Sequence, residues 1–308
     1  MFEYLIYRPL GFIIEQIYNL VQNYGWAIII FTIIVKLILL PLNIKSQKAM
    51  RKQQKLQPVL MELQRKYAND KEKLQMETMK LYKENNVSMM GGCLPMLIQF
   101  PILIGLYRVI QSPLKYLMGI DFTQQANIDK VGTIIDTLKA QGENIAMTVD
   151  QVIKNGQIQL ATWCERLGIA EWSFNFDFFG LDLSKNPSVA LSPLLKGDFS
   201  DIATIALLLI PILAMFTTWL SLWHNQKTAT QPQGNDSAQQ MSKSMNTMMP
   251  LLTGFFAFTL PGGLGIYWIA ANVFQLAQQV FMNVYFKEKE DDFVVKVPEK
   301  NRKKGKKR

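Results

Sequence analysis

Apolar residues gather in five stretches of the chain, separated by polar segments of very different length. Stretches this long and this poor in charge are typical of helices that cross a lipid bilayer. They predict spans at 23–44, 93–115, 202–223, 247–262 and 263–286. The expected fold class is therefore an all-α polytopic membrane protein with five transmembrane helices.

The last two predicted spans form a short pair. Pro261, Gly262 and Gly263 predict a tight turn between them. The fourth span offers only about 15 apolar positions, fewer than the ~20 that a full bilayer requires. This shortness suggests local thinning of the membrane or burial against the other spans.

Residues 1–22 precede the first span and mix apolar with polar positions, with few charges. This pattern predicts an amphipathic helix that lies in the outer membrane interface. The alternative is a short extra span. That alternative would invert the topology and would conflict with the charge counts given below.

Apolar residues recur at helical spacing through the polar segment 45–92, which predicts a cytoplasmic helical hairpin. Its helices are expected at about 45–67, interrupted by Pro58, and at about 71–86, with Asp70 as the N-cap of the second. The positions on the apolar faces are Leu56, Leu60, Leu63, Tyr67, Leu74, Thr78, Leu81 and Tyr82. The alternative is a solvated linker with a charged face.

Composition supports a membrane protein, because 49% of the 308 residues are hydrophobic and only 19% are charged. Residues 44–90 hold eleven Lys and Arg against five acids, and 287–308 hold ten against five. Residues 116–201 hold six against eleven. The positive-inside rule then places the hairpin, the loop at 224–246 and the basic tail at 287–308 in the cytoplasm. We expect a multi-pass protein of a bacterial plasma membrane, with its N-terminus outside.

Lys36 stands within the apolar run of the first span, one helical turn after Thr32. A cation at bilayer depth costs roughly 2.5–3.5 kcal/mol on insertion scales. The five predicted spans contain no Asp or Glu, so Lys36 has no counter-ion within them. An unpaired cation indicates a hydrated cavity, or a site that receives an acidic group from elsewhere.

Other polar or amphipathic side chains fall within the second and fifth spans. They are Gln99, Tyr267, Trp268, Asn272, Gln275, Gln278 and Gln279. Such residues usually face the interior of a helix bundle or a water-filled cavity. The alternative interpretation, which fits the Asn and Gln residues equally well, is hydrogen bonding between helices.

Catalytic chemistry is not indicated by any motif. The predicted spans carry no Asp, Glu or His constellation, and the glycine-rich GGLG at 262–265 lacks the context of a phosphate loop. Two cysteines, Cys93 and Cys164, and a single histidine do not have metal-site spacing. We therefore expect two unpaired thiols, no metal, no cofactor and no enzymatic activity.

Three segments together resemble the YidC family of membrane protein insertases. They are TIIVKLILLPL, LQPVLMELQRKYANDKEKLQMETMKLYKENNVSMMGGCLPMLIQFPILIGLY and LPGGLGIYWIAANVFQLAQQ. The similarity covers about 24–115 and 202–286, and GGCLPMLIQFPI is its most specific part. It is the shorter, five-span type of the family that the chain resembles.

The resemblance implies five helices around a hydrophilic groove that opens to the cytoplasm and to lipid. By motif position, Lys36 corresponds to the groove cation that attracts acidic residues of a substrate, although the family commonly has arginine there. Thr32, Gln99 and Trp268 match groove-lining or substrate-contacting positions. The cytoplasmic hairpin matches a mobile arm. Residues 120–170 look inserted into the long extracytoplasmic segment 116–201 and have no assigned role.

The expected function is that of a membrane protein insertase or foldase for small or single-spanning substrates. Tyr267, Asn272 and Gln275 are added to its substrate-binding groove on the basis of the polar pattern. Expected partners are nascent membrane proteins, anionic lipid, the ribosome through the basic tail, and the Sec translocon. For the tail, anchoring on anionic lipid is the alternative. Rival functions are a channel or transporter subunit with an anion-attracting lysine, and a structural scaffold.

Overall fold

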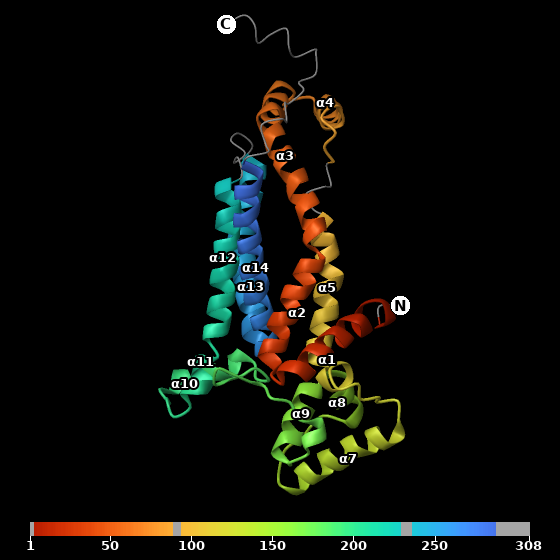
Figure 1. Cartoon of the computed structure of the whole chain (residues 1–308). Helices are drawn as coiled ribbons and strands as arrows, with labels where there is room; N and C mark the ends of the chain where they lie inside the picture. Colours follow the sequence, from red (N-terminus) through yellow and green to blue (C-terminus); the bar gives the residue numbers. More distant parts are fainter. Residues whose placement is uncertain (1–2, 89–93, 229–235, 288–308) are drawn as a thin grey trace, which may run out of the picture. The chain divides into compact units, whose positions relative to one another are not determined.

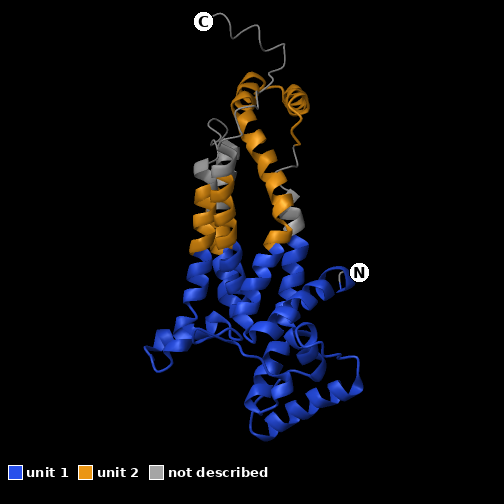
Figure 2. Cartoon of the chain, in the orientation of Figure 1, with its two compact units in different colours: residues 1–35, 99–215, 252–271 blue, residues 36–98, 216–251, 272–308 orange. Residues whose placement is uncertain are grey.

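The computed structural model describes residues 3–88, 94–228 and 236–287 and is built mostly from α-helices (Figure 1). The expectation of a mainly helical protein is confirmed at this level. The chain divides into two compact units (Figure 2). Unit 1 comprises 1–35, 99–215 and 252–271, and unit 2 comprises 36–98, 216–251 and 272–308.

Unit 1 begins with a short π-helix, Glu3–Tyr7, and helix α1, Arg8–Val21. One face of α1 is buried, through residues such as Ile14 and Tyr18, whereas Phe12 and Leu20 on it are exposed. The amphipathic helix expected in this region is therefore present. Its 14 residues are fewer than the ~20 that a span requires. Its position at a membrane surface stays a prediction.

The first predicted span is not one straight helix. Helix α2, Tyr24–Ile38, is followed at Leu39 by a 59° bend and then by α3, Leu40–Lys66. Pro41 explains the break, because proline has no N–H to donate and its ring clashes with the carbonyl of the residue four positions earlier. Lys36 consequently lies in the last turn of α2 rather than inside an unbroken apolar helix.

Helices α3 and α4, Lys71–Glu84, form the predicted hairpin in unit 2. Asp70 caps α4 as expected, because its carboxylate accepts the backbone N–H of Lys73 at 3.1 Å. The expected interruption at Pro58 was wrong, since α3 continues through it. Packing against α4 offsets the proline penalty of about 3 kcal/mol. The buried residues of this contact are Leu56, Leu63, Leu81 and Val87, with Val59, Leu60, Tyr67, Leu74 and Tyr82 packed around them.

The second apolar stretch forms helix α5, Leu94–Gln111, followed after Ser112 by the single turn α6, Pro113–Tyr116. Tyr24, at the start of α2, donates its buried hydroxyl to the backbone carbonyl of Ile110 at 2.9 Å. The backbone N–H of Tyr24 donates to the carbonyl of Asn175 at 3.1 Å. These bonds join the beginning of α2 to the end of α5 and to the outer segment within unit 1.

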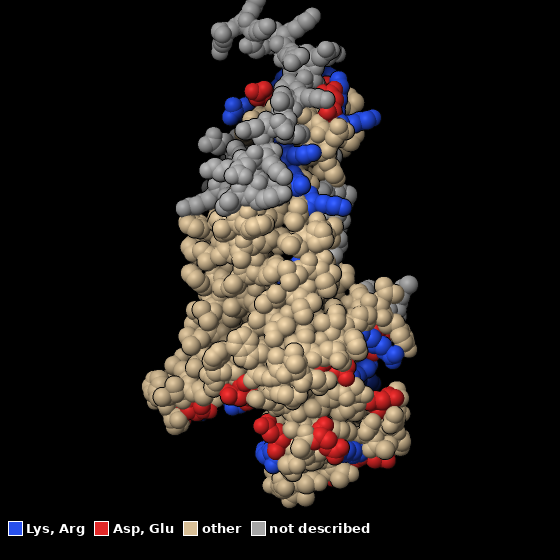
Figure 3. All heavy atoms as spheres, viewed as in Figure 1, with Lys and Arg blue, Asp and Glu red and all other residues tan. Residues whose placement is uncertain are grey.

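The region that looked inserted, 120–170, folds as three helices of unit 1: α7, Gln125–Ala140, α8, Val149–Asn155, and α9, Gln157–Arg166. Helix α7 buries Val131, Ile134, Ile135 and Leu138, which recur at helical spacing. These residues belong to the same hydrophobic core as Tyr24 and Ile110. In Figure 3, charged side chains of unit 1 gather over this helical region.

The rest of the outer segment consists of short helical turns, two short strands and two short helices. They are the 3-10 turns Ala170–Trp172 and Pro187–Ala190, the antiparallel strands β1 (Asp177–Phe178) and β2 (Leu181–Asp182), and helices α10 (Leu191–Lys196) and α11 (Ile202–Ala206). Phe174, Phe176 and Phe178 alternate with exposed polar residues and are buried. This alternation is the period-two pattern of an extended segment lying on a core.

Three long helices complete the chain: α12, Leu209–Thr228, α13, Asp236–Thr259, and α14, Gly262–Lys287. Helix α13 begins before the predicted span, so part of the loop expected at 224–246 is helical. Its Ala, Gln, Met and Lys residues favour helix without being apolar enough to indicate a span. In unit 1, α14 lies close to α2 and α12. A Cβ added to Gly263 would lie 2.8 Å from the Tyr24 ring, and one on Gly265 would clash with Ile210.

By length and composition, Ile202–His224 is the one stretch of the described residues that is suited to cross a membrane by itself. The bent pair α2 and α3 makes a second if it is taken as one span. Phe100–Gln111 and Thr247–Thr259 are shorter apolar helices. The number of five spans therefore stays a prediction.

Candidate functional site

The predicted groove residues belong to both units. Thr32, Gln99, Tyr267 and Trp268 belong to unit 1, and Lys36, Asn272 and Gln275 belong to unit 2. Gln99 lies on α5, and its side chain is outside the described part of the chain. The basic tail and Cys93 also lie outside the described residues.

Thr32 is the polar residue of α2 in unit 1 and is 1% exposed. Its hydroxyl donates to the carbonyl of Ile28, one turn earlier, at 2.7 Å. Back-bonding of this kind satisfies the hydroxyl within its own helix. Thr32 is thus compatible with an apolar environment, and its place in a groove stays a prediction.

Tyr267 and Trp268 lie near the start of α14 and face different surroundings. Tyr267 is 5% exposed and belongs to the core of unit 1. Trp268 is half-buried, and its ring stacks on Phe256 of α13 with centroids 6.4 Å apart and planes inclined by 20°. Trp268 is accordingly the member of this pair with surface left for another molecule.

Lys36 is half-buried in the last turn of α2. No hydrogen bond or salt bridge joins its ammonium to any residue that the structure describes. The expectation that Lys36 has no carboxylate partner, inferred from the acid-free spans, stays a prediction. A cation in this state is suited to attract an anionic group.

Asn272 makes two interhelical hydrogen bonds in unit 2. Its side-chain amide on α14 donates to the hydroxyls of Thr217 at 3.2 Å and Thr218 at 2.7 Å, both on α12. Asn272 therefore forms hydrogen bonds between helices, which was the alternative interpretation of this residue. Two adjacent threonines in an apolar stretch were the signal that could have identified its partners.

The other glutamines and asparagines of α14 differ in how they are satisfied. Gln275 is half-buried, and no hydrogen bond to its side chain occurs among the described residues. Gln279 is 4% exposed, and its Oε1 has no hydrogen-bond partner in the described chain. The two residues leave unused polar capacity on α14 in unit 2.

A polar contact that sequence reasoning missed connects three helices of unit 2. Arg51 on α3 donates to the side-chain oxygen of Asn283 on α14. The amide nitrogen of Asn283 lies 3.1 Å from Nε2 of His224 on α12. These residues are more than fifty positions apart in sequence, so no local pattern could have paired them. The contact attaches the first half of α3 to α12 and α14 near the ends of these two helices.

Among residues 3–88, 94–228 and 236–287, no three His, Cys, Asp or Glu side chains are grouped so that they could hold a metal ion. Cys164 is a free, buried thiol in α9. Burial raises its pKa to about 11, and the charge of Lys130 opposes this only in part. The thiol is therefore poorly suited to act as a nucleophile.

The chain is similar to known proteins over nearly its whole length. Residues 16–290 match the model of a family described as 60Kd inner membrane protein. The membrane protein insertase YidC of Caldanaerobacter subterraneus subsp. tengcongensis is 31% identical over 89% of this chain and 92% of its own length. The chain belongs to the YidC family.

Two further relatives are longer proteins. ALBINO3-like protein 1, chloroplastic, of Arabidopsis thaliana is 30% identical over 85% of this chain. The membrane protein insertase YidC of Wolinella succinogenes is 27% identical over 90% of it. The chain spans only 44% and 36% of the length of these two relatives. The family indicated by the sequence motifs is confirmed by the family model and by these relatives.

Proposed function

We propose that this chain is a membrane protein insertase and foldase that acts on small or single-spanning substrates. Its membership of the YidC family and the names of its relatives support this function. The observation that carries the mechanism is the Lys36 ammonium, which has no hydrogen-bond or ion-pair partner among the described residues. The chain retains this cation in a sequence otherwise suited to lipid, at a cost of roughly 2.5–3.5 kcal/mol.

In the proposed mechanism, a substrate enters a hydrophilic groove from the cytoplasmic side. Lys36 attracts acidic residues of the segment that must cross the membrane. Thr32, Gln99, Tyr267, Trp268, Asn272 and Gln275 are the remaining groove residues of the proposal. The apolar segment of the substrate then leaves into the bilayer, where burial of its apolar surface supplies the driving force.

The cytoplasmic parts of the chain are proposed to receive the substrate. The arm formed by α3 and α4 has its own small core, so it can move as a body. Basic residues in its first half, among them Lys45 and Lys52, are suited to contact anionic lipid. The basic tail is proposed to bind ribosomal RNA through phosphate contacts, and the Sec translocon is a proposed partner for larger substrates.

Depletion of the protein in its own cells, followed by a membrane-insertion assay with a small single-spanning substrate, tests the proposed function. Insertion should fall on depletion and return when the full chain is supplied again. Normal insertion in depleted membranes would exclude the insertase function. Ion flux measured in the same depleted membranes separates this function from that of a channel. Loss of an insertase should leave the flux unchanged, whereas loss of a channel should reduce it.

A further inference from the structure

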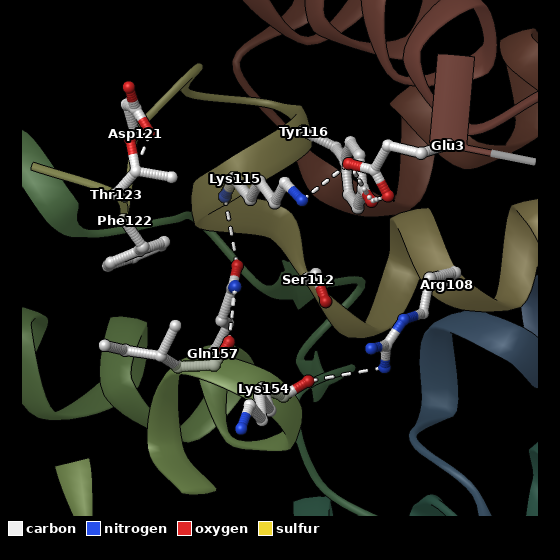
Figure 4. Close-up of a pocket in the computed structure, with 11 residues that line it drawn as sticks. Glu3, Arg108, Ser112, Lys115, Tyr116, Asp121, Phe122, Thr123, Lys154 and Gln157 are labelled. Carbon is white, nitrogen blue, oxygen red and sulfur yellow. Dashed lines mark hydrogen bonds and ion pairs between the residues drawn. The ribbon is translucent and has the colours of Figure 1, made fainter. Parts of the chain in front are cut away.

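A small cavity of about 200 Å³ lies in unit 1 beside the end of α5. Side chains from the π-helix before α1, from α5 and α6 and from the α8–α9 region border it (Figure 4). The volume is several times the ~30 Å³ that one water occupies in the liquid. The cavity is therefore large enough for a polar group of several atoms.

Ser112 provides the first indication that the cavity binds a polar group. It borders the cavity and is 3% exposed, and its hydroxyl has no hydrogen-bond partner among the described residues. Figure 4 shows its oxygen pointing into the space bordered by Arg108 and Gln157. Although the residue is almost fully enclosed, its hydroxyl oxygen opens into the cavity and is available to a group held there.

Arg108 provides the second indication. Its Nη1 donates to the carbonyl of Lys154 at 3.3 Å and to Oδ1 of Asn155 at 3.5 Å, both long contacts with uncharged groups. No carboxylate of the described chain forms a salt bridge with it. A guanidinium carries five N–H donors and binds carboxylate or phosphate in a bidentate manner. Most of this capacity remains unused in Arg108.

Of the other charged side chains at the cavity, both lysines are paired, whereas the Asp121 carboxylate accepts hydrogen bonds from the backbone N–H and the hydroxyl of Thr123 and forms no salt bridge within the described chain. Lys115 forms a salt bridge with Glu3 at 2.6 Å, and Lys154 forms one with Asp150 at 2.9 Å. Burial by itself raises the pKa of Glu3, but the hydrogen bonds from Lys115 and Tyr116 and the positive charges of Lys115 and Arg8 outweigh it and hold that pKa below its ordinary value. Glu3 is thus ionised at neutral pH. Arg108 remains as the cation at the cavity without a carboxylate partner among the described residues.

The surroundings of the cavity indicate the source of the anion. Glu3 at the cavity is followed directly by the exposed Tyr4 and Leu5, and Arg108 follows the exposed Ile104 and Tyr107 on α5. Exposed apolar side chains next to a cationic site are typical of the level at which lipid headgroups meet acyl chains. The charge pattern of the chain places this end of α5 at the outer leaflet.

We propose that the cavity binds the phosphate of a phospholipid headgroup from the outer leaflet, with Arg108 and Ser112 as its ligands. Arg108 supplies charge-assisted hydrogen bonds, and Ser112 donates its hydroxyl. The proposal depends on the predicted orientation and not on insertase activity, so its test is a binding measurement that requires no insertion.

The experiment is native mass spectrometry of the full chain in detergent, titrated with phosphatidylglycerol. Diacylglycerol with the same acyl chains tests for the headgroup, and inorganic phosphate tests for a free anion. Arg108→Gln should weaken phosphatidylglycerol binding about tenfold, and Ser112→Ala should weaken it about threefold. Arg166→Gln is the matched control, because Arg166 is paired with Glu143 on the outer segment and does not border this cavity. It should leave binding unchanged.

Each outcome decides the question. Unchanged phosphatidylglycerol binding in Arg108→Gln and Ser112→Ala would overturn the proposal. Equal binding of diacylglycerol would show that the phosphate is not recognised. Equal binding of inorganic phosphate would assign the cavity to a free anion instead of a lipid. If Arg108→Gln does not fold, Ser112→Ala carries the test, because it removes one oxygen and leaves every charge in place.

Discussion

The side-chain amide of Asn272 on α14 donates to the hydroxyl of Thr218 on α12 across 2.7 Å. The apolar pattern of the chain marks Asn272 as a polar residue in a span but does not say which helix it faces. The bond shows that at least part of its hydrogen-bonding capacity holds two helices of unit 2 together. Asn272 is therefore a structural contact first, whatever it contributes to a groove.

Asn272 and Thr218 should be energetically coupled, because each stabilises the fold partly through the bond to the other. A double-mutant cycle of Asn272→Ala and Thr218→Val should give a coupling of about 0.6–1.7 kcal/mol, the range found for hydrogen bonds between membrane helices. Unfolding of the purified protein in mixed micelles measures it. The control cycle pairs Asn272→Ala with Thr259→Val, because Thr259 bonds to its own helix. Additive effects in both cycles would contradict the assigned bond.

The charge of Lys36 should matter most for substrates with acidic outer tails. We expect Lys36→Ala to reduce their insertion about tenfold, which corresponds to ~1.4 kcal/mol, and Lys36→Arg to retain it because the charge is kept. A pair of substrates that differ only in the acidic residues of the outer tail provides the comparison. Lys71→Ala, which removes an exposed cation from α4, serves as control. Equal insertion of both substrates by Lys36→Ala would show that the cation is not the attraction site.

The cytoplasmic arm should depend on its own small core. Leu81 is 0% exposed at the contact between α4 and α3, whereas Met79 on the same helix is 53% exposed. Leu81→Ala should destabilise the hairpin by about 2–5 kcal/mol, and Met79→Ala should have little effect. Amide hydrogen exchange over α3 and α4 reports the difference. Equal exchange in the two variants would show that the hairpin does not hold together by this contact.

The thiol of Cys164 should resist alkylation in the folded protein. Burial raises its pKa from 9.0 to about 11, so at pH 8 its thiolate fraction falls roughly a hundredfold. Because the folded pKa is the higher one, stability should be retained below pH 9 and should decline as pH rises from about 9 towards 11. Maleimide labelling in a Cys93→Ser background measures the reactivity.

The matched control for Cys164 is a thiol at an exposed position of the same helical region. Thr137→Cys in a chain without Cys93 and Cys164 should react at the rate of an ordinary thiol, because position 137 is exposed on α7. Labelling of Cys164 should reach that rate only after unfolding. Rapid labelling of Cys164 in the folded protein at pH 8 would contradict its burial.

Sequence reasoning succeeded where the deciding interactions are local. Asp70 was identified as an N-cap because a cap bonds to the backbone three residues later. The apolar face of the arm was identified because one helix period brings its residues together. The reasoning failed at Pro58, where packing on α4 outweighs the proline penalty, and at the start of α13, whose polar first turns are helical without being apolar.

By itself, the sequence determined that the protein is helical and rich in apolar stretches, which residues cap and line its arm, and to which family it belongs. Only the tertiary structure decided that Asn272 bonds to α12, that Arg51 reaches Asn283, and that Ser112 and Arg108 border one cavity. The reason is physical. Helix periodicity and caps depend on bonds between residues a few positions apart, whereas the partner across a helix contact depends on register and crossing angle. Many weak contacts set these jointly, and no short pattern in the chain records them.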